Sequence, residues 1–243
     1  MQRGLLSAPM AALANAVPFL FSGRIWAVVV FPLVGAAMLW TVIGLLAWTP
    51  LTTWLSTKLF GADGGFSLFA AGVAVALLLM LAAVLTALVV VAVLAMPVIV
   101  DTVASRNFAS LAKLHGGTFA GSLRNAVVAI GVFVPLWLLA LLLLAVPPVY
   151  VAVSLLLSAW LNARLFRYDA LAAHADRDEM RSVIHAARRR LLMLGFVLSP
   201  LSLVPIVNLF APIFAGIAFT CLCLDELAAH RALGAPKFTE TGN

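Results

Sequence analysis

The chain has 243 residues, of which 65% are apolar and only 10% are charged. Soluble globular domains carry about 25% charged residues, so this composition excludes an ordinary soluble domain and predicts a membrane protein. The net charge of +6 would suggest a nucleic-acid partner in a soluble protein. We expect none here, because the basic residues follow the membrane topology described below.

Six apolar segments alternate with polar stretches along the chain. They are approximately 25–48, 66–100, 126–146, 149–163, 191–204 and 206–224. A helix needs about 20 residues to cross the bilayer core, so the first two segments are long enough to span it. The second segment exceeds that length, and we expect its helix to break at Pro97, because proline removes a backbone donor.

The last two pairs of segments are shorter. Residues 191–224 contain 34 residues without a charge, including a turn around Pro200 to Pro205. Two full spans and a turn would need upwards of about 40 residues, so we expect a re-entrant hairpin. Residues 126–163, with a turn at Pro147 and Pro148, form either a second such hairpin or two tight spans. Non-helical backbone at membrane depth must be covered by protein or water, which predicts a homo-oligomer.

The basic residues indicate the orientation. If the N-terminus, residues 101–125, residues 164–190 and the C-terminal tail share one side, 14 of the 15 Lys and Arg residues lie there and only Lys58 lies opposite. Basic loops stay in the cytoplasm. We therefore expect a multi-pass protein whose N- and C-termini are both cytoplasmic.

Residues 164–190 form the most polar stretch. Within it, apolar residues at helical spacing predict an amphipathic helix along the cytoplasmic surface. These residues are Met180, Val183, Ile184 and Ala187. Three consecutive basic residues follow, and they are Arg188, Arg189 and Arg190. They either anchor the chain at the membrane or form a basic mouth that attracts anions.

Two further groups of polar residues and prolines are candidates for an anion site or pathway. The first follows the expected break and comprises Pro97, Asp101, Ser105, Arg106 and Asn107. It forms either a helix cap or a site of solute access. The second comprises Pro205, Asn208 and Pro212 in the last hairpin. Broken helices bind anions in transporters; alternatively, these residues only reverse the chain.

The sequence contains no catalytic triad, phosphate-binding glycine loop or pair of catalytic carboxylates. We expect no enzyme activity, catalytic residue or cofactor. A metal held by His174, Asp178 and His185 is a weaker interpretation than a solvated polar face, so no metal site is expected. Cys221 and Cys223 lie two residues apart in an apolar run, where side chains on a helix point apart. They are expected to be buried free thiols.

Several landmarks together resemble the CysZ-type sulfate permease family, whose eukaryotic relatives are the etoposide-induced membrane proteins. They are FSGRIWAVVVFPL (21–33), Met96-Pro97, YDALAAH (168–174) and LGFVLSPLSLVPIVNLFAPIFAGIAFT (194–220). The resemblance covers roughly residues 15–227. It implies an all-α membrane fold with two long membrane helices and two hemi-penetrating helical hairpins. It also implies assembly as oligomers and sulfate import for cysteine synthesis.

The family's sulfate site resembles P-F-N-G-L followed by a glutamate, just after an alanine-proline break. Here the segment reads MPVIVDTVASRNF (96–108), in which Pro97 matches, the Asn-Gly-Leu and the glutamate do not, and Asp101 is out of register. The resemblance therefore implies the fold and membrane placement more strongly than sulfate specificity.

These patterns predict a single membrane domain over 1–243, with a core at about 15–227 and a flexible cytoplasmic tail at 228–243. The expected location is a bacterial inner membrane, and the expected partners are membrane lipid and a small inorganic anion. We predict a permease for sulfate or a related small oxyanion. The alternative is a non-transporting membrane scaffold or membrane-homeostasis protein of the same fold.

Overall fold

The computed structural model of the protein describes residues 4–61, 64–203 and 205–234. Every regular element in these residues is a helix, which confirms the predicted all-α class. The helices form two compact units. The smaller unit contains Gly23–Ala95, and the larger one combines Met1–Ser22 with Met96–Asn243.

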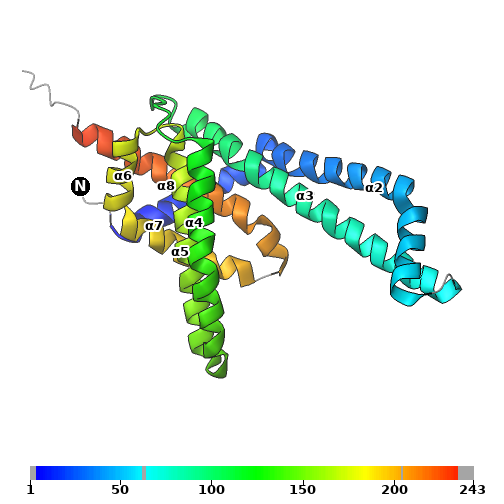
Figure 1. Ribbon diagram of the computed structural model, residues 1–243. Helices are drawn as coiled ribbons and strands as arrows, with labels where there is room; N and C mark the ends of the chain where they lie inside the picture. Colours follow the sequence, from blue (N-terminus) through cyan, green and yellow to red (C-terminus); the bar gives the residue numbers. More distant parts are fainter. Residues whose placement is uncertain (1–3, 62–63, 204, 235–243) are drawn as a thin grey trace, which may run out of the picture. The chain divides into compact units, whose positions relative to one another are not determined.

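The smaller unit is a helical hairpin. Its first helix is α2 (Gly23–Phe60) and its second is the N-terminal part of α3 (Gly65–Asn107), and Figure 1 shows the two side by side. The indole nitrogen of Trp40 donates a hydrogen bond to the hydroxyl of Thr86 at 3.0 Å. α2 turns sharply in its C-terminal third (Figure 1), the part that contains Pro50, because proline removes a backbone donor and crowds the preceding turn.

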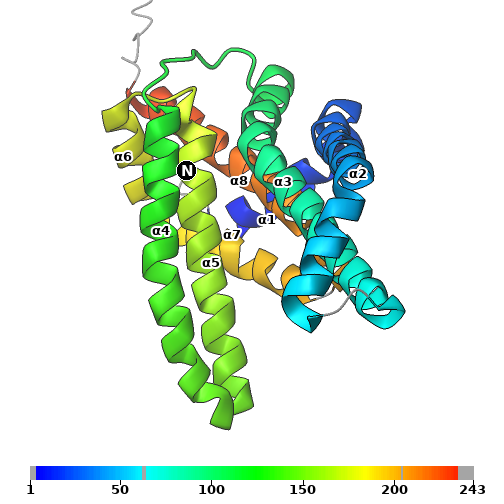
Figure 2. The ribbon, with the colours of Figure 1, turned by 45° about the vertical axis from the view of Figure 1, so that its right-hand side comes forward.

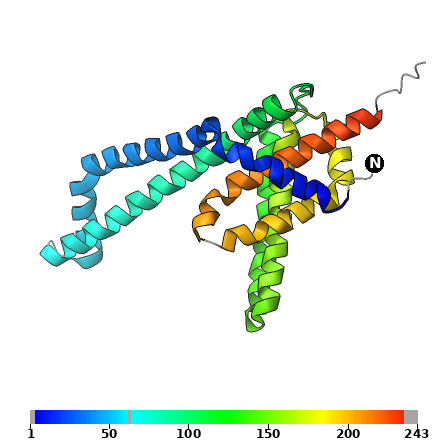
Figure 3. The same cartoon turned by 180° about the vertical axis from the view of Figure 1, so that it is seen from behind.

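The larger unit contains the last turns of α3 and all remaining elements. In chain order these are α1 (Ser7–Ala16), the 3₁₀ helix η1 (Val17–Phe21), α4 (Phe119–Ala140), η2 (Leu141–Ala145), α5 (Pro147–Ala172), α6 (Arg177–Ala186), α7 (Arg188–Leu198), η3 (Ser199–Leu203) and α8 (Pro205–Gly234). α4 and α5 form a long hairpin (Figure 2), and α1 lies across α7 and α8 (Figure 3). α1 is not among the apolar segments predicted from the sequence.

Both predicted proline turns are present. η2 ends at Ala145 and α5 begins at Pro147, while η3 separates α7 from the start of α8 at Pro205. α7 has 11 residues, which is too short for a bilayer core of about 30 Å. The depth of this last hairpin in a membrane stays a prediction. α8 continues through residues 228–234, part of the expected tail, and residues 235–243 lie outside the described chain.

The predicted break at Pro97 is wrong. α3 continues through Pro97 and ends at Asn107. Side chains near the proline pack on α8, since a Cβ atom at Gly216 would lie 3.1 Å from the sulfur of Met96 and 3.3 Å from the Cδ1 atom of Ile99. Because Gly216 leaves room for these contacts, packing offsets the backbone hydrogen bond that the proline removes.

Five helices of the described chain are long and apolar enough to cross a membrane. They are Gly23–Lys58, Gly65–Asn107, Phe119–Ala145, Pro147–Ala172 and Phe210–Leu233. In each of the first four helices, only 6% to 11% of the most apolar stretch is buried, as expected of helices that face lipid. In the fifth helix, 67% of this stretch is buried. There Phe219 of α8 stacks on Phe166 of α5, with 5.6 Å between ring centres, so α8 forms the centre of the larger unit.

Candidate functional site

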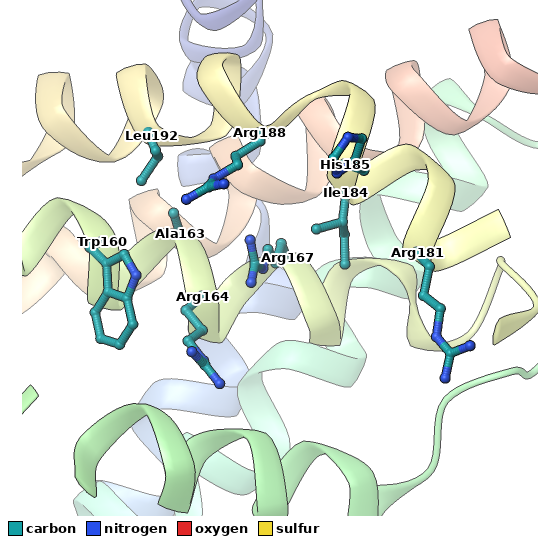
Figure 4. A pocket seen from close by; sticks show the side chains of 9 residues that line it. All are labelled: Trp160, Ala163, Arg164, Arg167, Arg181, Ile184, His185, Arg188 and Leu192. Atoms are coloured by element: carbon teal, nitrogen blue, oxygen red, sulfur yellow. The ribbon is translucent and has the colours of Figure 1, made fainter. Parts of the chain in front are cut away.

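The larger unit contains a pocket of about 390 Å³ between α5, α6 and α7. We call it the basic pocket, and its lining residues are Trp160, Ala163, Arg164, Arg167, Arg181, Ile184, His185, Arg188 and Leu192. Figure 4 shows the side chains of Arg167 and Arg188 close together near the middle of the pocket, with Trp160 and Arg181 at its two ends.

Helical spacing places these side chains on three facing surfaces. On α5 the lining residues recur every three or four positions from Trp160 to Arg167, so they share one face. On α7, Arg188 and Leu192 are one turn apart. α6 buries Met180 and Val183, which confirms the predicted amphipathic helix. The residues that α6 contributes to the pocket are Arg181, Ile184 and His185.

α7 lies close against α5 because a glycine faces that helix. A Cβ atom at Gly195 would lie 2.5 Å from the backbone oxygen of Ala159, so a larger residue would force the helices apart. α5 and α7 run in opposite directions. Two turns away from this contact on each helix, Arg167 and Arg188 therefore lie side by side in the pocket.

The basic pocket has four guanidinium groups in its lining and no carboxylate. Among the described residues, Arg164, Arg167 and Arg188 form no ion pair with an acidic side chain. A guanidinium nitrogen of Arg181 lies 3.7 Å from a carboxylate oxygen of Asp178. Because these side chains are 83% and 93% exposed, water screens their attraction. The positively charged guanidinium groups of the lining repel one another. An anion bound between these groups would relieve that repulsion.

Arg164 is held at one end of the pocket by an aromatic ring. Its guanidinium carbon lies 5.3 Å from the ring centre of Trp160, a cation–π arrangement. The Nε atom of Arg164 is buried and has no hydrogen-bond partner in the described chain. A buried donor without a partner costs free energy. The four arginines of the lining suit the pocket to an anion whose oxygens accept hydrogen bonds from guanidinium groups.

A polar cluster fixes α6, which forms one wall of the pocket. Asp176 caps the helix, and Glu179 completes a capping box. The guanidinium of Arg231, on α8, donates to the two carboxylate oxygens of Glu179 at 3.0 and 2.8 Å and to the backbone oxygen of His174 at 2.7 Å. The hydrogen bonds from Arg231 hold the pKa of Glu179 below its usual value. This link attaches the N-terminal end of α6 to α8.

His174 lies in the connection between α5 and α6 and is 1% exposed. Burial lowers its pKa, and the positive charges of Lys113 and Arg231 lower the pKa further. Within the described residues its Nδ1 atom has no hydrogen-bond partner. The side chain of His174 is therefore a neutral, buried imidazole at neutral pH.

The described residues contain no metal centre. Over residues 4–61, 64–203 and 205–234, no three His, Cys, Asp or Glu side chains come close enough to hold a metal ion. Cys221 and Cys223 are buried and form no disulfide, which confirms the prediction of free thiols.

The predicted cluster after Pro97 lies on α3, away from the lining of the basic pocket. Asp101 is inside α3 rather than at its end, so this residue does not cap the helix. Its carboxylate accepts a hydrogen bond from Lys113 at 2.9 Å. The last turn of α3 contains Ser105, Arg106 and Asn107, and the guanidinium of Arg106 lies over the ring of Phe19 at 5.7 Å. A role of this cluster in an anion pathway stays a prediction.

The proline residues of the last hairpin have different positions in α8. Pro205 begins the helix, Asn208 lies in its first turn and Pro212 lies inside it without ending it. The side chains of Pro205 and Asn208 lie outside the described part of the structure. Their predicted contribution to anion binding is therefore untested.

The structure separates the three consecutive arginines. Arg188 lines the basic pocket, Arg190 donates a hydrogen bond to the carboxylate of Glu226, and Arg189 is exposed outside the lining. Sequence reasoning did not assign the other charged and aromatic lining residues to an anion site. These are Trp160, Arg164, Arg167, Arg181 and His185. Their signal in the sequence is two arginines almost one helical turn apart, directly after an apolar segment with a tryptophan near its end.

The helices define a polytopic membrane protein, and the basic pocket gives it a site with strong positive charge. The model of the family described as sulfate transporter CysZ/etoposide-induced protein 2.4 matches residues 12–212. The chain belongs to this family. A comparison with individual curated proteins found no match.

Proposed function

We propose that the protein is a permease for sulfate or a related small oxyanion in a bacterial inner membrane. In this proposal the protein assembles as a homo-oligomer, both termini are cytoplasmic, and the basic pocket is the cytoplasmic anion-binding site of the pathway. The observation that carries it is that Arg167 and Arg188 lie close together in a pocket whose lining has four arginines and no carboxylate. The family name supports sulfate as the substrate.

The pocket suits transient binding of an anion. Several positive charges at one mouth raise the local anion concentration. Guanidinium groups bind oxyanions through paired hydrogen bonds, and Arg167 and Arg188 lie close together in the pocket. Arg181 and Arg188 are exposed, so a bound anion keeps part of its hydration. Binding that is favourable but weak is what conduction requires, because the anion must also leave.

A non-transporting membrane scaffold of the same fold is the second candidate. The observation that favours it is the segment MPVIVDTVASRNF at 96–108, which lacks the Asn-Gly-Leu and the glutamate of the family's sulfate site. A scaffold has no need to bind sulfate, whereas a permease must bind it. Equilibrium binding therefore distinguishes the two candidates.

The test measures sulfate binding to the purified full-length protein in neutral lipid nanodiscs. Arg167→Gln and Arg188→Gln should each weaken sulfate binding about tenfold or more, because each removes a charge-assisted hydrogen bond. Arg189→Gln is the matched control, since it removes the same charge from the adjacent residue outside the pocket lining. It should bind sulfate as the unmodified protein does.

The pocket variants should also remain folded. Removing one of several repelling charges should leave the unfolding temperature of the anion-free protein unchanged or raise it. If the folded unmodified protein binds no sulfate, or if Arg189→Gln weakens binding as much as Arg188→Gln, the basic pocket is not the oxyanion site.

A further inference from the structure

The basic pocket has an apolar side as well as a cationic one. Trp160, Ala163, Ile184 and Leu192 contribute apolar surface beside the guanidinium groups. On α5 the pocket lies where an uncharged run, residues 149–163, gives way to the first arginine. Such a transition marks the boundary between the bilayer core and the headgroup region, where tryptophan is common.

The apolar side continues beyond the pocket. One turn before Trp160 on α5 lies Leu156, which is 56% exposed, and one turn after Leu192 on α7 lies Phe196, which is 44% exposed. Because α5 and α7 are antiparallel, both residues extend the pocket in the direction away from Arg167 and Arg188. The cationic pocket therefore leads into an exposed apolar strip formed by Leu156 and Phe196.

A ligand that fits both parts has an anionic head joined to an acyl chain. Guanidinium groups between helices at a membrane boundary are suited to lipid phosphate. The absence of a carboxylate in the lining selects against lipids that carry choline or ethanolamine, because nothing in the lining balances their positive charge. Phosphatidylglycerol has a net negative charge and carries no cationic group.

We propose that the basic pocket binds the phosphate of an anionic phospholipid of the phosphatidylglycerol class, whose acyl chain lies along Leu156 and Phe196. The lipid and a free oxyanion then compete for the same guanidinium groups. Lipid binding rests on the pocket alone, whereas the competition rests on the proposed function. Anionic lipid in the surrounding membrane thus lowers the occupancy of the site by oxyanion.

The first experiment counts lipids bound to the purified full-length protein by native mass spectrometry, with dioleoyl phosphatidylglycerol and dioleoyl phosphatidylcholine as probes. Phosphatidylglycerol should be retained in preference to phosphatidylcholine. Arg188→Gln and Phe196→Ser should each weaken its binding about tenfold, through loss of a charged hydrogen bond or of apolar contact. Arg189→Gln and Leu139→Ser are the controls, because Arg189 is outside the lining and Leu139 is a 61% exposed leucine on α4.

The second experiment compares sulfate affinity in nanodiscs of phosphatidylcholine alone and in nanodiscs that also contain phosphatidylglycerol. Phosphatidylglycerol should weaken sulfate binding by the unmodified protein. Phe196→Ser should bind sulfate normally in phosphatidylcholine and should lose most of the effect of phosphatidylglycerol. If that effect is undiminished in Phe196→Ser, it comes from the charge of the membrane surface and the competition is refuted.

The two proposals fail in different ways. Sulfate binding without preferential retention of phosphatidylglycerol overturns the lipid site and leaves the permease standing. Retention of phosphatidylglycerol without sulfate binding supports the lipid site and overturns the permease. If Arg189→Gln or Leu139→Ser weakens lipid binding as much as the pocket variants do, the lipid binds to the surface generally and the assigned site is wrong.

Discussion

Two single residues illustrate how local packing sets the chemistry of this protein. The lack of a side chain at Gly195 allows the close approach to Ala159 that brings Arg167 beside Arg188. At His174, burial and the charges of Lys113 and Arg231 favour the neutral imidazole. In both cases the neighbours along the chain do not reveal the effect, because the partners come from other helices.

His174 should make the protein less stable in mildly acidic solution. Its folded pKa is lowered, so below the unfolded value of about 6.5 the unfolded state binds more protons and stability falls as the pH falls. The loss should not exceed about 1.4 kcal/mol per pH unit. The loss of stability is measured from unfolding temperatures in detergent at several pH values between 7.5 and 5. In the variant His174→Gln, stability should no longer fall with pH over this range. If it falls as much as in the unmodified protein, other titratable groups cause the pH dependence.

The site could be predicted only in part, for a physical reason. Arg188 was predicted to belong to a membrane anchor or a basic mouth, because three arginines in a row are conspicuous at a membrane boundary. Arg164 and Arg167 were not, since basic residues after an apolar segment are equally typical of positive-inside anchoring. What distinguishes them is the absence of carboxylates around them, which depends on how α5, α6 and α7 pack.

Among the elements, α6 has the most direct influence on the basic pocket. This helix has 10 residues, which is too few for stability on its own in water. Its apolar face packs against the rest of the larger unit. The hydrogen bonds from Arg231 to Glu179 attach its N-terminal end to α8. The wall of the pocket that α6 supplies therefore depends on this link.

Replacing Glu179 by Gln should loosen α6 and widen the pocket. The change removes a charged pair whose side chains are only 23% and 21% exposed, and we expect a loss of about 1–2 kcal/mol in stability. Asp178→Asn is the matched control, because Asp178 is also in the first turn of α6 but is 93% exposed. Hydrogen exchange of the 177–186 amides should accelerate in Glu179→Gln alone, and equal acceleration in both variants would contradict the role of Arg231.

Most elements could be predicted because apolar length and proline position are local signals. Both proline turns follow from them, and the helical spacing of apolar residues, which is also a local signal, predicts the amphipathic α6. The break at Pro97 was wrong because contacts of Met96 and Ile99 with α8 support the helix beyond the proline. α1 (Ser7–Ala16) was missed because its run of small residues is too short to suggest a membrane segment, and its packing against α7 and α8 is a tertiary effect.

For the whole molecule, the distribution of basic residues along the sequence predicts one direction of insertion. Five helices of the described residues are long and apolar enough to cross a membrane, and 14 of the 15 Lys and Arg residues belong to the regions predicted to be cytoplasmic. The basic pocket is built from three elements of that region. A permease with this layout would bind oxyanion from the cytoplasmic face and would be sensitive to the lipids around it.

The measurement that tests the permease proposal most directly is uptake of radiolabelled sulfate into phosphatidylcholine proteoliposomes containing the purified protein. We expect saturable uptake that selenate inhibits and phosphate does not. At low sulfate, Arg188→Gln should reduce uptake about tenfold, and Arg189→Gln should not reduce it. Folded, correctly inserted protein that takes up no sulfate, or uptake that is unchanged in Arg188→Gln, would contradict transport through the basic pocket.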